Sequence, residues 1–396
     1  MFEQLETLPP DPILGLSVAF REDSSRDKVD LSVGIYRDRS GTTPVMKAAR
    51  TAERALVEEQ STKAYLPPAG APGFREGIFR LALGTEGGSL RNRTAVIQAP
   101  GGCGALRLGA ELIQRAAAGA TVLLSDPTWP NHAPLMSGGG LSLGKYPYYD
   151  AATHALRLQP MLEALDSTPP GTVVLLQTSC HNPTGVDPTR EEWRAILEVV
   201  ERRALVPFFD MAYQGLGDDL DADAWSLREA AGRLPEVLVA VSCSKNFGLY
   251  RERTGALLVL GADPGRARAI ETQANKAARS MYSMPPGHGA LIAERILSDP
   301  ELGAQWREEL VGMAARLRSL REALAAEIER ARPGIDARWL TRHRGMFSLL
   351  GLPRPAVDAL REQHHIYMGF DSRVNIAGLS EDRVADVARL VAPHLD

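Results

Sequence analysis

The chain has few cysteines and no long apolar run. Its 396 residues include three cysteines, Cys103, Cys180 and Cys243, which lie far apart and form no CxxC pair. This spacing argues against a disulfide framework and a zinc site, so we expect reduced thiols and no metal. No window reaches the roughly 18 uninterrupted apolar residues that a membrane-spanning helix requires, so we expect no membrane partner.

An excess of positive charge is also missing. The formal net charge of -4 at pH 7 argues against nucleic acid or an anionic membrane as a partner. The first residues, MFEQLETLPPDPILG, do not place a basic start before an apolar core, so we expect a cytoplasmic protein. The hydrophobic fraction of 44% and the charged fraction of 24% are those of an ordinary globular protein, whose ligand we expect to be small.

Between residues 44 and 260, short apolar runs alternate with segments of helical periodicity. Five runs are expected to be buried strands: TVLLS (121–125), TVVLLQ (172–177), LVPFFD (205–210), EVLVAVS (236–242) and GALLVL (255–260). Segments such as EEWRAILEVVERR supply the connecting helices. This alternation predicts an α/β fold with a mostly parallel sheet.

A second, smaller unit is expected at the C-terminal end. A helix that begins near Pro300 carries apolar residues at intervals of three and four. Short strands follow it in GMFSLLG, IYMGF and RVNIA, and LSVGIY at residues 31–36 is expected to join them. We therefore predict a discontinuous α+β small domain of residues 13–44 and 311–396, and a large domain of residues 45–310.

Lys245 stands in SCSKNFGLYRERTG, directly after the predicted strand EVLVAVS. A lone lysine is usually a solvated surface charge, because burial of an ammonium is costly unless it is compensated. This amine, however, lies at the carboxyl end of a predicted strand, where open α/β folds bind ligands. An amine in that place can condense with an aldehyde.

Three other strand ends carry polar groups to the same edge of the sheet, in DPTWPNH, TSCHNPTG and DMAYQG. Asp210, the first residue of DMAYQG, closes an apolar run. It is either a helix N-cap or a carboxylate that keeps a pyridine nitrogen protonated.

The glycines of GGCGALRLGAELI stand at the start of a predicted helix, where free N–H groups bind phosphate. Arg107 occupies the place of the third glycine of a dinucleotide motif, so a single phosphate fits better than a nicotinamide cofactor. Pyridoxal phosphate requires a lysine, an acid, an aromatic face and a cationic phosphate site together.

With these motifs the chain resembles the class I aspartate and aromatic aminotransferases, which are fold-type I pyridoxal-phosphate enzymes. The likeness runs from DPILGL near the start to SRVNIAGL near the end. It implies pyridoxal 5'-phosphate as cofactor, a ping-pong exchange of an amino group between amino acids and 2-oxo acids, and a homodimer with shared active sites. Residues 1–12 would form an arm that embraces the partner.

The resemblance implies three catalytic residues. Lys245 matches the lysine that forms a Schiff base with the cofactor and later moves a proton between Cα and the cofactor's C4′. Asp210 matches the partner of the pyridine nitrogen, and His132 matches the group that orients this aspartate. Tyr213 matches, together with Asn182, a hydrogen-bond donor to the phenolate oxygen of the cofactor, an interaction that lowers the pKa of the Schiff base.

The remaining contacts with the cofactor are implied in the same way. Trp129 matches the ring that stacks on the pyridine. The expected phosphate site consists of Gly102, Cys103, Ser242, Ser244 and Arg253. Tyr65 in KAYLP matches a tyrosine that reaches the phosphate of the neighbouring subunit.

For the substrate, Arg373 in SRVNIAG matches the arginine that binds the α-carboxylate. Arg279 in ARSMYSMPP matches the arginine that reaches across the dimer to a distal carboxylate. Planar, bidentate pairing explains why both are arginine and not lysine. Gly34, Trp129 and Asn182 are also expected to line the substrate.

The chain departs from the family pattern at four positions. Cys103 replaces a hydroxyl residue of the phosphate site, and Gln177 replaces a histidine behind His132. Ala64 and Met284 stand where aspartate-selective members commonly have asparagine. A more apolar pocket favours an aryl ring at roughly 25 cal/mol for each Å² covered, so about 60 Å² gives on the order of tenfold.

We therefore expect an aminotransferase that moves the amino group of phenylalanine, tyrosine or tryptophan to 2-oxoglutarate. One alternative is aspartate aminotransferase, and another is a pathway-specific enzyme for a modified aryl amino acid. A β-lyase or decarboxylase would keep Lys245 and Asp210 but has less need of Arg279. A ligand sensor fused to a regulator is disfavoured because no DNA-binding extension precedes the first motif and the net charge is negative.

Overall fold

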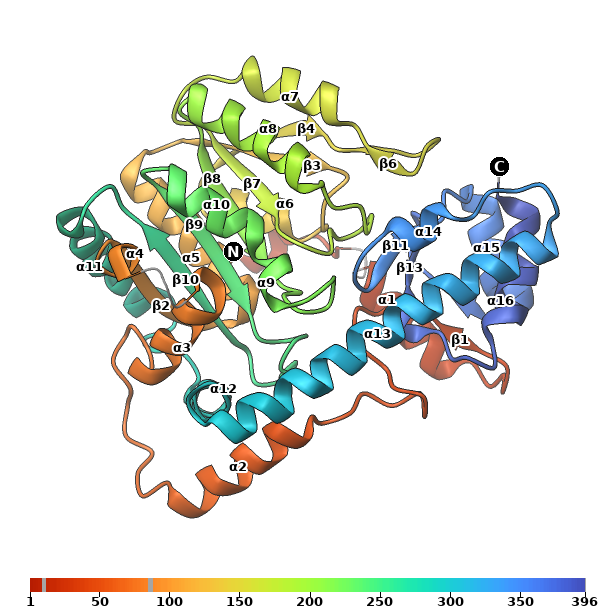
Figure 1. The fold of residues 1–396 in the computed structure, drawn as a ribbon, viewed down its shortest axis with the longest axis horizontal. Helices are drawn as coiled ribbons and strands as arrows, with labels where there is room; N and C mark the ends of the chain where they lie inside the picture. Colours follow the sequence, from red (N-terminus) through yellow and green to blue (C-terminus); the bar gives the residue numbers. More distant parts are fainter. Residues whose placement is uncertain (9–11, 85–87, 396) are drawn as a thin grey trace.

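A computed structural model describes residues 1–8, 12–84 and 88–395 of the chain. Its centre is a seven-stranded sheet in the order β2-β10-β9-β8-β7-β3-β4 (Figure 1). The strands are β2 (Thr94–Pro100), β3 (Thr121–Asp126), β4 (Ser142–Pro147), β7 (Val173–Gln177), β8 (Val206–Met211), β9 (Val237–Ser242) and β10 (Thr254–Leu260). The predicted α/β class and all five predicted strands are confirmed.

Two strands of this sheet were not predicted, and one has an unexpected direction. β2 and β4 were missed because neither TAVIQAP nor SLGKYP is a continuous apolar run. β4 pairs with β3 alone and is largely polar, as an edge strand can be. β10 runs antiparallel to both β2 and β9, because the loop 243–253 after β9 holds no crossover helix.

The central strands of the sheet are buried on both faces, because helices cover each side (Figure 1). Phe208 and Phe209 are neighbours in β8, both are 0% exposed, and they pack into two separate apolar clusters. Successive side chains of a strand point to opposite faces of the sheet, and both faces are covered here. The sequence of β8 is therefore an unbroken apolar run. The helices of this layered unit are α2 (Lys47–Glu59), α3 (Pro72–Leu83), α4 (Gly88–Asn92), α5 (Gly101–Ala116), α6 (His132–Gly138), α7 (Leu158–Asp166), α8 (Arg190–Arg202), α9 (Leu220–Asp223), α10 (Trp225–Arg233), α11 (Pro264–Met281) and α12 (Gly287–Ser298).

The long helix α13 (Pro300–Ala331) leads from the central sheet to a smaller unit (Figure 1). This unit contains two short strand pairs. β1 (Val29–Asp30) pairs with β12 (Ile366–Tyr367), and β11 (Phe347–Leu349) pairs with β13 (Arg373–Asn375). Its other helices are α1 (Pro12–Glu22), α14 (Trp339–Arg342), α15 (Arg354–His364) and α16 (Val384–Val391), and a small hairpin of β5 (Tyr149–Asp150) and β6 (Ala155–Leu156) projects from the large unit.

The early segment joins the C-terminal unit as expected, but the predicted strand at residues 31–36 is wrong. The strand ends at Asp30, and the next residues form a loop. Two of their carbonyl groups accept from one side chain, since Asn375 Nδ2 donates to the oxygens of Val33 at 2.7 Å and Ile35 at 2.8 Å. The domain boundaries given above stay a prediction.

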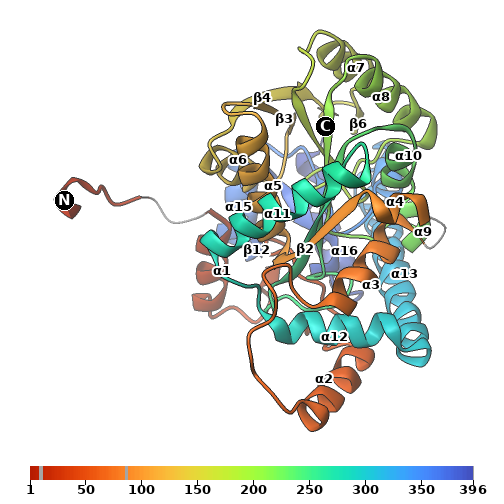
Figure 2. The same cartoon turned by 90° about the vertical axis from the view of Figure 1, so that its left-hand side faces the viewer.

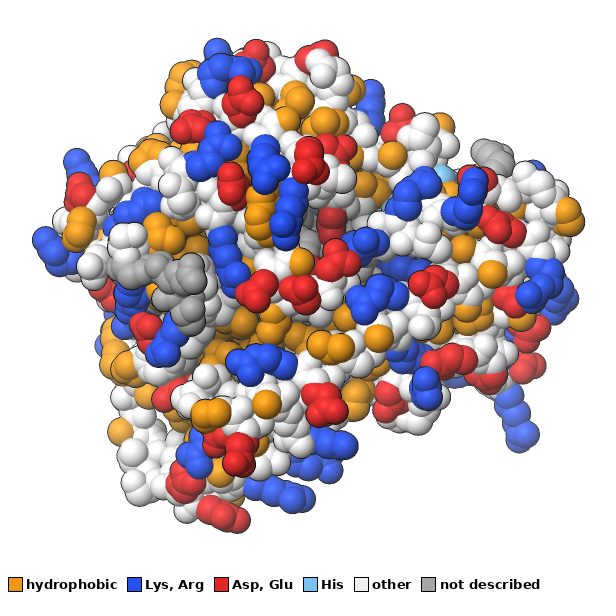
Figure 3. Space-filling model, in the orientation of Figure 1, with side chains coloured by type: hydrophobic (Ala, Val, Ile, Leu, Met, Phe, Trp, Pro, Cys, Tyr) orange, Lys and Arg blue, Asp and Glu red, His pale blue; other side chains and the backbone are white. Residues whose placement is uncertain are grey.

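The amino-terminal residues stand apart from the rest of the molecule (Figure 2). Met1, Phe2, Leu5 and Leu8 are all largely exposed there. Elsewhere, acidic and basic side chains are interspersed over the face in Figure 3, in keeping with the small net charge of -4. Among the described residues, no helix is both long and apolar enough to cross a membrane.

Candidate active site

A cavity of about 280 Å³ lies at the carboxyl ends of β7, β8 and β9. Most of the site residues predicted from the sequence line it. They are Gly34, Gly102, Cys103, Trp129, Asn182, Asp210, Tyr213, Ser242, Ser244, Lys245, Arg253 and Arg373. Segments from both ends of the chain thus line one cavity, where their side chains can contact the same ligand.

Lys245 lies in the turn after β9, and its amine faces the cavity. Within the described part of the chain, its Nζ has no hydrogen bond or ion pair, and it lies 5.5 Å from the centroid of the Tyr213 ring and 5.8 Å from that of Tyr250. Burial lowers the pKa of the Lys245 amine below its usual value, and the negative charge of Asp210 opposes this change. A lowered pKa makes a larger share of the amine neutral and nucleophilic.

Asp210 is the next-to-last residue of β8, and one of its two carboxylate oxygens is held by a neighbouring side chain. His132 Nε2 lies 3.0 Å from Asp210 Oδ2, and His132 Nδ1 lies 2.7 Å from Thr128 Oγ1. The His132 side chain is 0% exposed, so the chain Thr128–His132–Asp210 fixes the carboxylate from behind. Its other oxygen has no partner among the described residues and can accept a hydrogen bond from a protonated ring nitrogen of a ligand.

Asn182, Tyr213 and Arg373 form one hydrogen-bonded group in the lining of the cavity. Asn182 Nδ2 donates to the Tyr213 hydroxyl at 3.5 Å, and Arg373 Nη1 donates to Asn182 Oδ1 at 3.3 Å. Burial raises the pKa of Tyr213 and lowers that of Arg373. Arg373 has no salt bridge among the described residues, although its Nη2 donates to the Ser32 carbonyl at 2.8 Å. A buried guanidinium with a spare face is suited to bind a carboxylate.

The predicted phosphate site gathers at the N-terminus of α5. Arg253 Nη1 donates to Ser244 Oγ at 3.4 Å, and the Ser244 amide donates to Ser242 Oγ at 3.3 Å. A Cβ added to Gly102 would stand 3.1 Å from Ser242 Cβ, so glycine keeps this cradle open. Free helix N–H groups, hydroxyls and a guanidinium together fit a phosphate group.

Cys103 lies in the first turn of α5, where its Sγ accepts a hydrogen bond from Asn131 Nδ2 at 3.7 Å. The thiol therefore lines the cavity beside the cradle, as a weaker donor than a hydroxyl. Trp129 also lines the cavity and meets the His132 ring edge-on at 5.2 Å between centroids.

Two predicted site residues do not reach this cavity. Tyr65 is 89% exposed, and Arg279 is exposed and donates to Ser283 Oγ at 2.6 Å. The two belong to adjacent surface segments, because the Leu66 amide lies 3.2 Å from Met284 Sδ. Ala64 and Met284, the two departures in the predicted substrate pocket, therefore lie on this same surface and outside the cavity of the single chain.

Phe347 is the site residue that sequence reasoning missed. Its ring lies 4.6 Å from Arg373 Cζ, meets the Tyr213 ring edge-on at 6.2 Å, and lines the cavity with Leu106 and Ala212. Gly34 lies against this ring, since an added Cβ would stand 2.8 Å from Phe347 Cζ. The only signal was the strand pattern of GMFSLLG, which indicates burial and gives no direction.

Gln177 was expected to lie behind His132, but its side chain bonds to a different residue. Its side-chain amide makes two hydrogen bonds, both with the backbone of Asn182. His181, in the same loop, instead contacts Ser125 through Nε2 at 3.0 Å and Thr184 through Nδ1 at 2.9 Å. Burial lowers the pKa of His181 well below its usual value, so this ring is neutral near pH 7.

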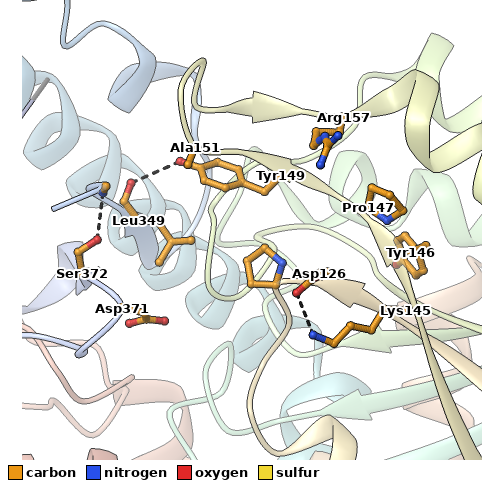
Figure 4. A pocket seen from close by; sticks show the side chains of 12 residues that line it. Asp126, Lys145, Tyr146, Pro147, Tyr149, Ala151, Arg157, Leu349, Asp371 and Ser372 are labelled. Carbon is orange, nitrogen blue, oxygen red and sulfur yellow. Dashed lines mark hydrogen bonds and ion pairs between the residues drawn. The ribbon is translucent and has the colours of Figure 1, made fainter. Parts of the chain in front are cut away.

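A larger cavity of about 550 Å³ opens between the two units, away from Lys245 (Figure 4). Its charged residues are exposed or already paired, as Lys145 Nζ is with Asp126 Oδ1 at 3.3 Å. Tyr149 spans it by donating to the Leu349 carbonyl at 3.5 Å. This cavity lies where the hairpin of the large unit meets the small unit. Unlike the cavity around Lys245, it does not bring a buried amine, a carboxylate and a guanidinium together.

The sequence is similar to those of known aminotransferases. A family model described as aminotransferase class I and II matches residues 26–391. An aromatic-amino-acid aminotransferase of Pseudomonas aeruginosa is 44% identical over 99% of this chain and 98% of its own length. The aspartate aminotransferase of Escherichia coli is 38% identical over 100% of both chains.

Solved structures agree. The crystal structure of an aromatic-amino-acid aminotransferase from Burkholderia pseudomallei, covalently bound to pyridoxal phosphate, matches with a TM-score of 0.97. That protein is 40% identical, with 100% of both chains covered. A cytoplasmic aspartate aminotransferase of Saccharomyces cerevisiae matches with a TM-score of 0.96 at 33% identity, over 99% of this chain and 98% of its own.

Proposed function

Because this chain belongs to the class I and II aminotransferases, we propose that it transfers the amino group of phenylalanine, tyrosine or tryptophan to 2-oxoglutarate by a ping-pong reaction. Membership of this family makes the chain an aminotransferase and sets aside the lyase, decarboxylase and sensor alternatives. One observation carries the proposal: a buried amine, a carboxylate and a guanidinium share one cavity, and among the described residues one carboxylate oxygen has no partner and the guanidinium has no salt bridge.

The cofactor we propose is pyridoxal 5'-phosphate, which supplies an electron sink for the charge that develops at Cα of the amino acid. The cradle of Gly102, Cys103, Ser242, Ser244 and Arg253 would hold the phosphate. Asp210, steadied by His132, would hold a proton on the ring nitrogen. Tyr213 and Asn182 would donate hydrogen bonds to the phenolic oxygen, and Trp129 would cover one face of the ring.

Lys245 Nζ would bind the cofactor and afterwards act on the substrate. The neutral amine would take a proton from Cα of the amino acid, and the lowered pKa of Lys245 keeps that neutral form populated. Arg373 would fix the α-carboxylate by a bidentate pair and so orient the Cα–H bond toward the amine. Phe347 and Gly34 would enclose the other side of the substrate.

We propose a homodimer in which each site is completed by Tyr65 and Arg279 of the partner subunit. Two features support it: both side chains are exposed in the single chain, and apolar Met1, Phe2 and Leu5 are exposed in the separate amino-terminal segment. Exposed apolar side chains on an extended segment favour burial against another surface. A cytoplasmic location stays a prediction from the sequence.

The preference for aryl substrates rests on the two apolar positions, Ala64 and Met284, and on the names of the similar proteins. The alternative, an aspartate aminotransferase, is supported by the Escherichia coli protein at 38% identity. An enzyme for a modified aryl amino acid is a third possibility of the same chemistry.

The test is a panel of amino donors ranked by kcat/KM with 2-oxoglutarate as acceptor. We expect phenylalanine, tyrosine or tryptophan to lead. A tenfold lead of aspartate over phenylalanine would establish the alternative, and protein that stays colourless after incubation with pyridoxal phosphate would overturn the proposal as a whole.

A further inference from the structure

Both polar atoms of the Gln177 side chain bond to a single neighbour. It is 6% exposed, at the end of β7, opposite Asp210 in the register of β7 and β8. Its Nε2 donates to the Asn182 carbonyl at 2.9 Å, and its Oε1 accepts from the Asn182 amide at 2.9 Å. Both ends of one side-chain amide therefore close a ring onto the backbone of one residue.

The loop that Gln177 closes has an unfavourable backbone conformation. Ser179 and Cys180 have φ of 59° and 58°, a region that L-residues rarely adopt. The Asp187 carboxylate also accepts from the amides of Cys180 at 2.6 Å and His181 at 2.9 Å. The loop thus depends on two side chains, and Gln177 is the one that lines the active-site cavity.

The two hydrogen bonds from Gln177 hold the backbone of Asn182 in position. Its side chain is the bridge between the Tyr213 hydroxyl and the Arg373 guanidinium. Under the proposed function, those two groups serve the cofactor and the substrate carboxylate respectively. A small rotation of the Asn182 backbone would move its amide relative to both.

We propose that Gln177 is a positioning residue that, through the Asn182 backbone, aligns the Asn182 amide with the cofactor's phenolic oxygen and with Arg373. This inference rests on the proposed function. It assigns Gln177 to the cofactor's oxygen and the substrate carboxylate, and not to the ring nitrogen held by Asp210.

The test compares Gln177→Met with Thr178→Val in the holoenzyme. Methionine keeps the length of glutamine and removes both hydrogen bonds. Thr178 is the adjacent residue and is also buried, but its hydroxyl bonds the Asp223 carbonyl at 3.2 Å and Ser226 Oγ at 2.6 Å, away from the cavity. Both variants lose buried hydrogen bonds in one loop, so both should lower the thermal unfolding temperature.

Only Gln177→Met should change the site. A loosened Asn182 amide stabilises the anionic phenolic oxygen less, so the pKa of the lysine-bound cofactor should rise by about 1, measured by titrating its visible absorbance. KM for phenylalanine should rise on the order of five- to tenfold, the effect of about one lost hydrogen bond. If Gln177→Met does not fold, Gln177→Asn, whose shorter side chain cannot reach both backbone atoms, should give the same changes.

A double-mutant cycle with Asn182→Ala decides whether the effect passes through Asn182. In that background, Gln177→Met should change neither the cofactor pKa nor KM. Additive effects, or a Gln177→Met variant that matches Thr178→Val, would overturn the inference while the parent enzyme still binds pyridoxal phosphate and transaminates. Failure of the parent protein to bind the cofactor would instead overturn the proposed function.

Discussion

Replacing Gly34 with alanine tests the contact between the early loop and the missed site residue, Phe347. The added Cβ would stand 2.8 Å from Phe347 Cζ, whereas carbon atoms in contact are normally about 3.5–4.0 Å apart. The ring tip must therefore retreat by about 0.7 Å or more. Retreat is hindered because Phe347 is 2% exposed and lies between the Tyr213 ring and the Arg373 guanidinium.

Overpacking of this kind costs about 1–3 kcal/mol. If the ring moves toward Arg373, it displaces the guanidinium that is proposed to bind the α-carboxylate. The free energy of substrate binding is then less favourable by the same amount, and kcat/KM should fall by about fivefold to a hundredfold. The assay is steady-state kcat/KM for phenylalanine and for 2-oxoglutarate, with thermal unfolding measured alongside. Both substrates should suffer, because both carry the α-carboxylate that Arg373 is proposed to bind.

Gly312→Ala is the matched control. Gly312 lies on the exposed side of α13 and an added Cβ meets nothing within 4 Å. Alanine should stabilise this helix by about 1 kcal/mol without changing kcat/KM. A Gly34→Ala enzyme with unchanged kcat/KM for both substrates would refute the placement of Phe347 and Gly34 at the substrate.

Three further changes probe other parts of the molecule. Because burial lowers the pKa of Lys245, the pH dependence of the rate of pyridoxal-phosphate binding to apoprotein should have its midpoint below that of a free lysine amine. A midpoint at or above that of a free lysine amine would contradict the shift, and Lys245→Ala should show no covalent binding. Arg279→Ala should reduce kcat/KM for aspartate by about a hundredfold and spare phenylalanine, whereas equal losses would contradict its role at the distal carboxylate. Thr189→Ala removes the capping box that Thr189 and Glu192 form at α8, so chemical denaturation should show a loss of about 1 kcal/mol with kcat unchanged; an unchanged unfolding free energy would argue against the cap.

The positions of Lys245 and Asp210 followed from the sequence because each comes directly after a short apolar run. Parallel strands place their carboxyl ends at one edge, so residues after different strands had to converge. The cavity does gather the predicted cofactor residues other than Tyr65, although their roles remain proposals. The same argument does not reach Tyr65 and Arg279, since their proposed partners belong to a second copy of the chain.

The α/β class, the strands β3, β7, β8, β9 and β10, and the family could be predicted from the amino-acid sequence, because local patterns and motifs encode them. The direction of β10, the loop after Asp30, and the contact of Gly34 with Phe347 became visible only in the folded chain. The hydrogen bonds of Gln177 to the Asn182 backbone belong to the same group. These features are contacts between residues that lie far apart in the sequence. Which of several possible partners a side chain contacts depends on how the distant segments pack, and no local pattern encodes that packing.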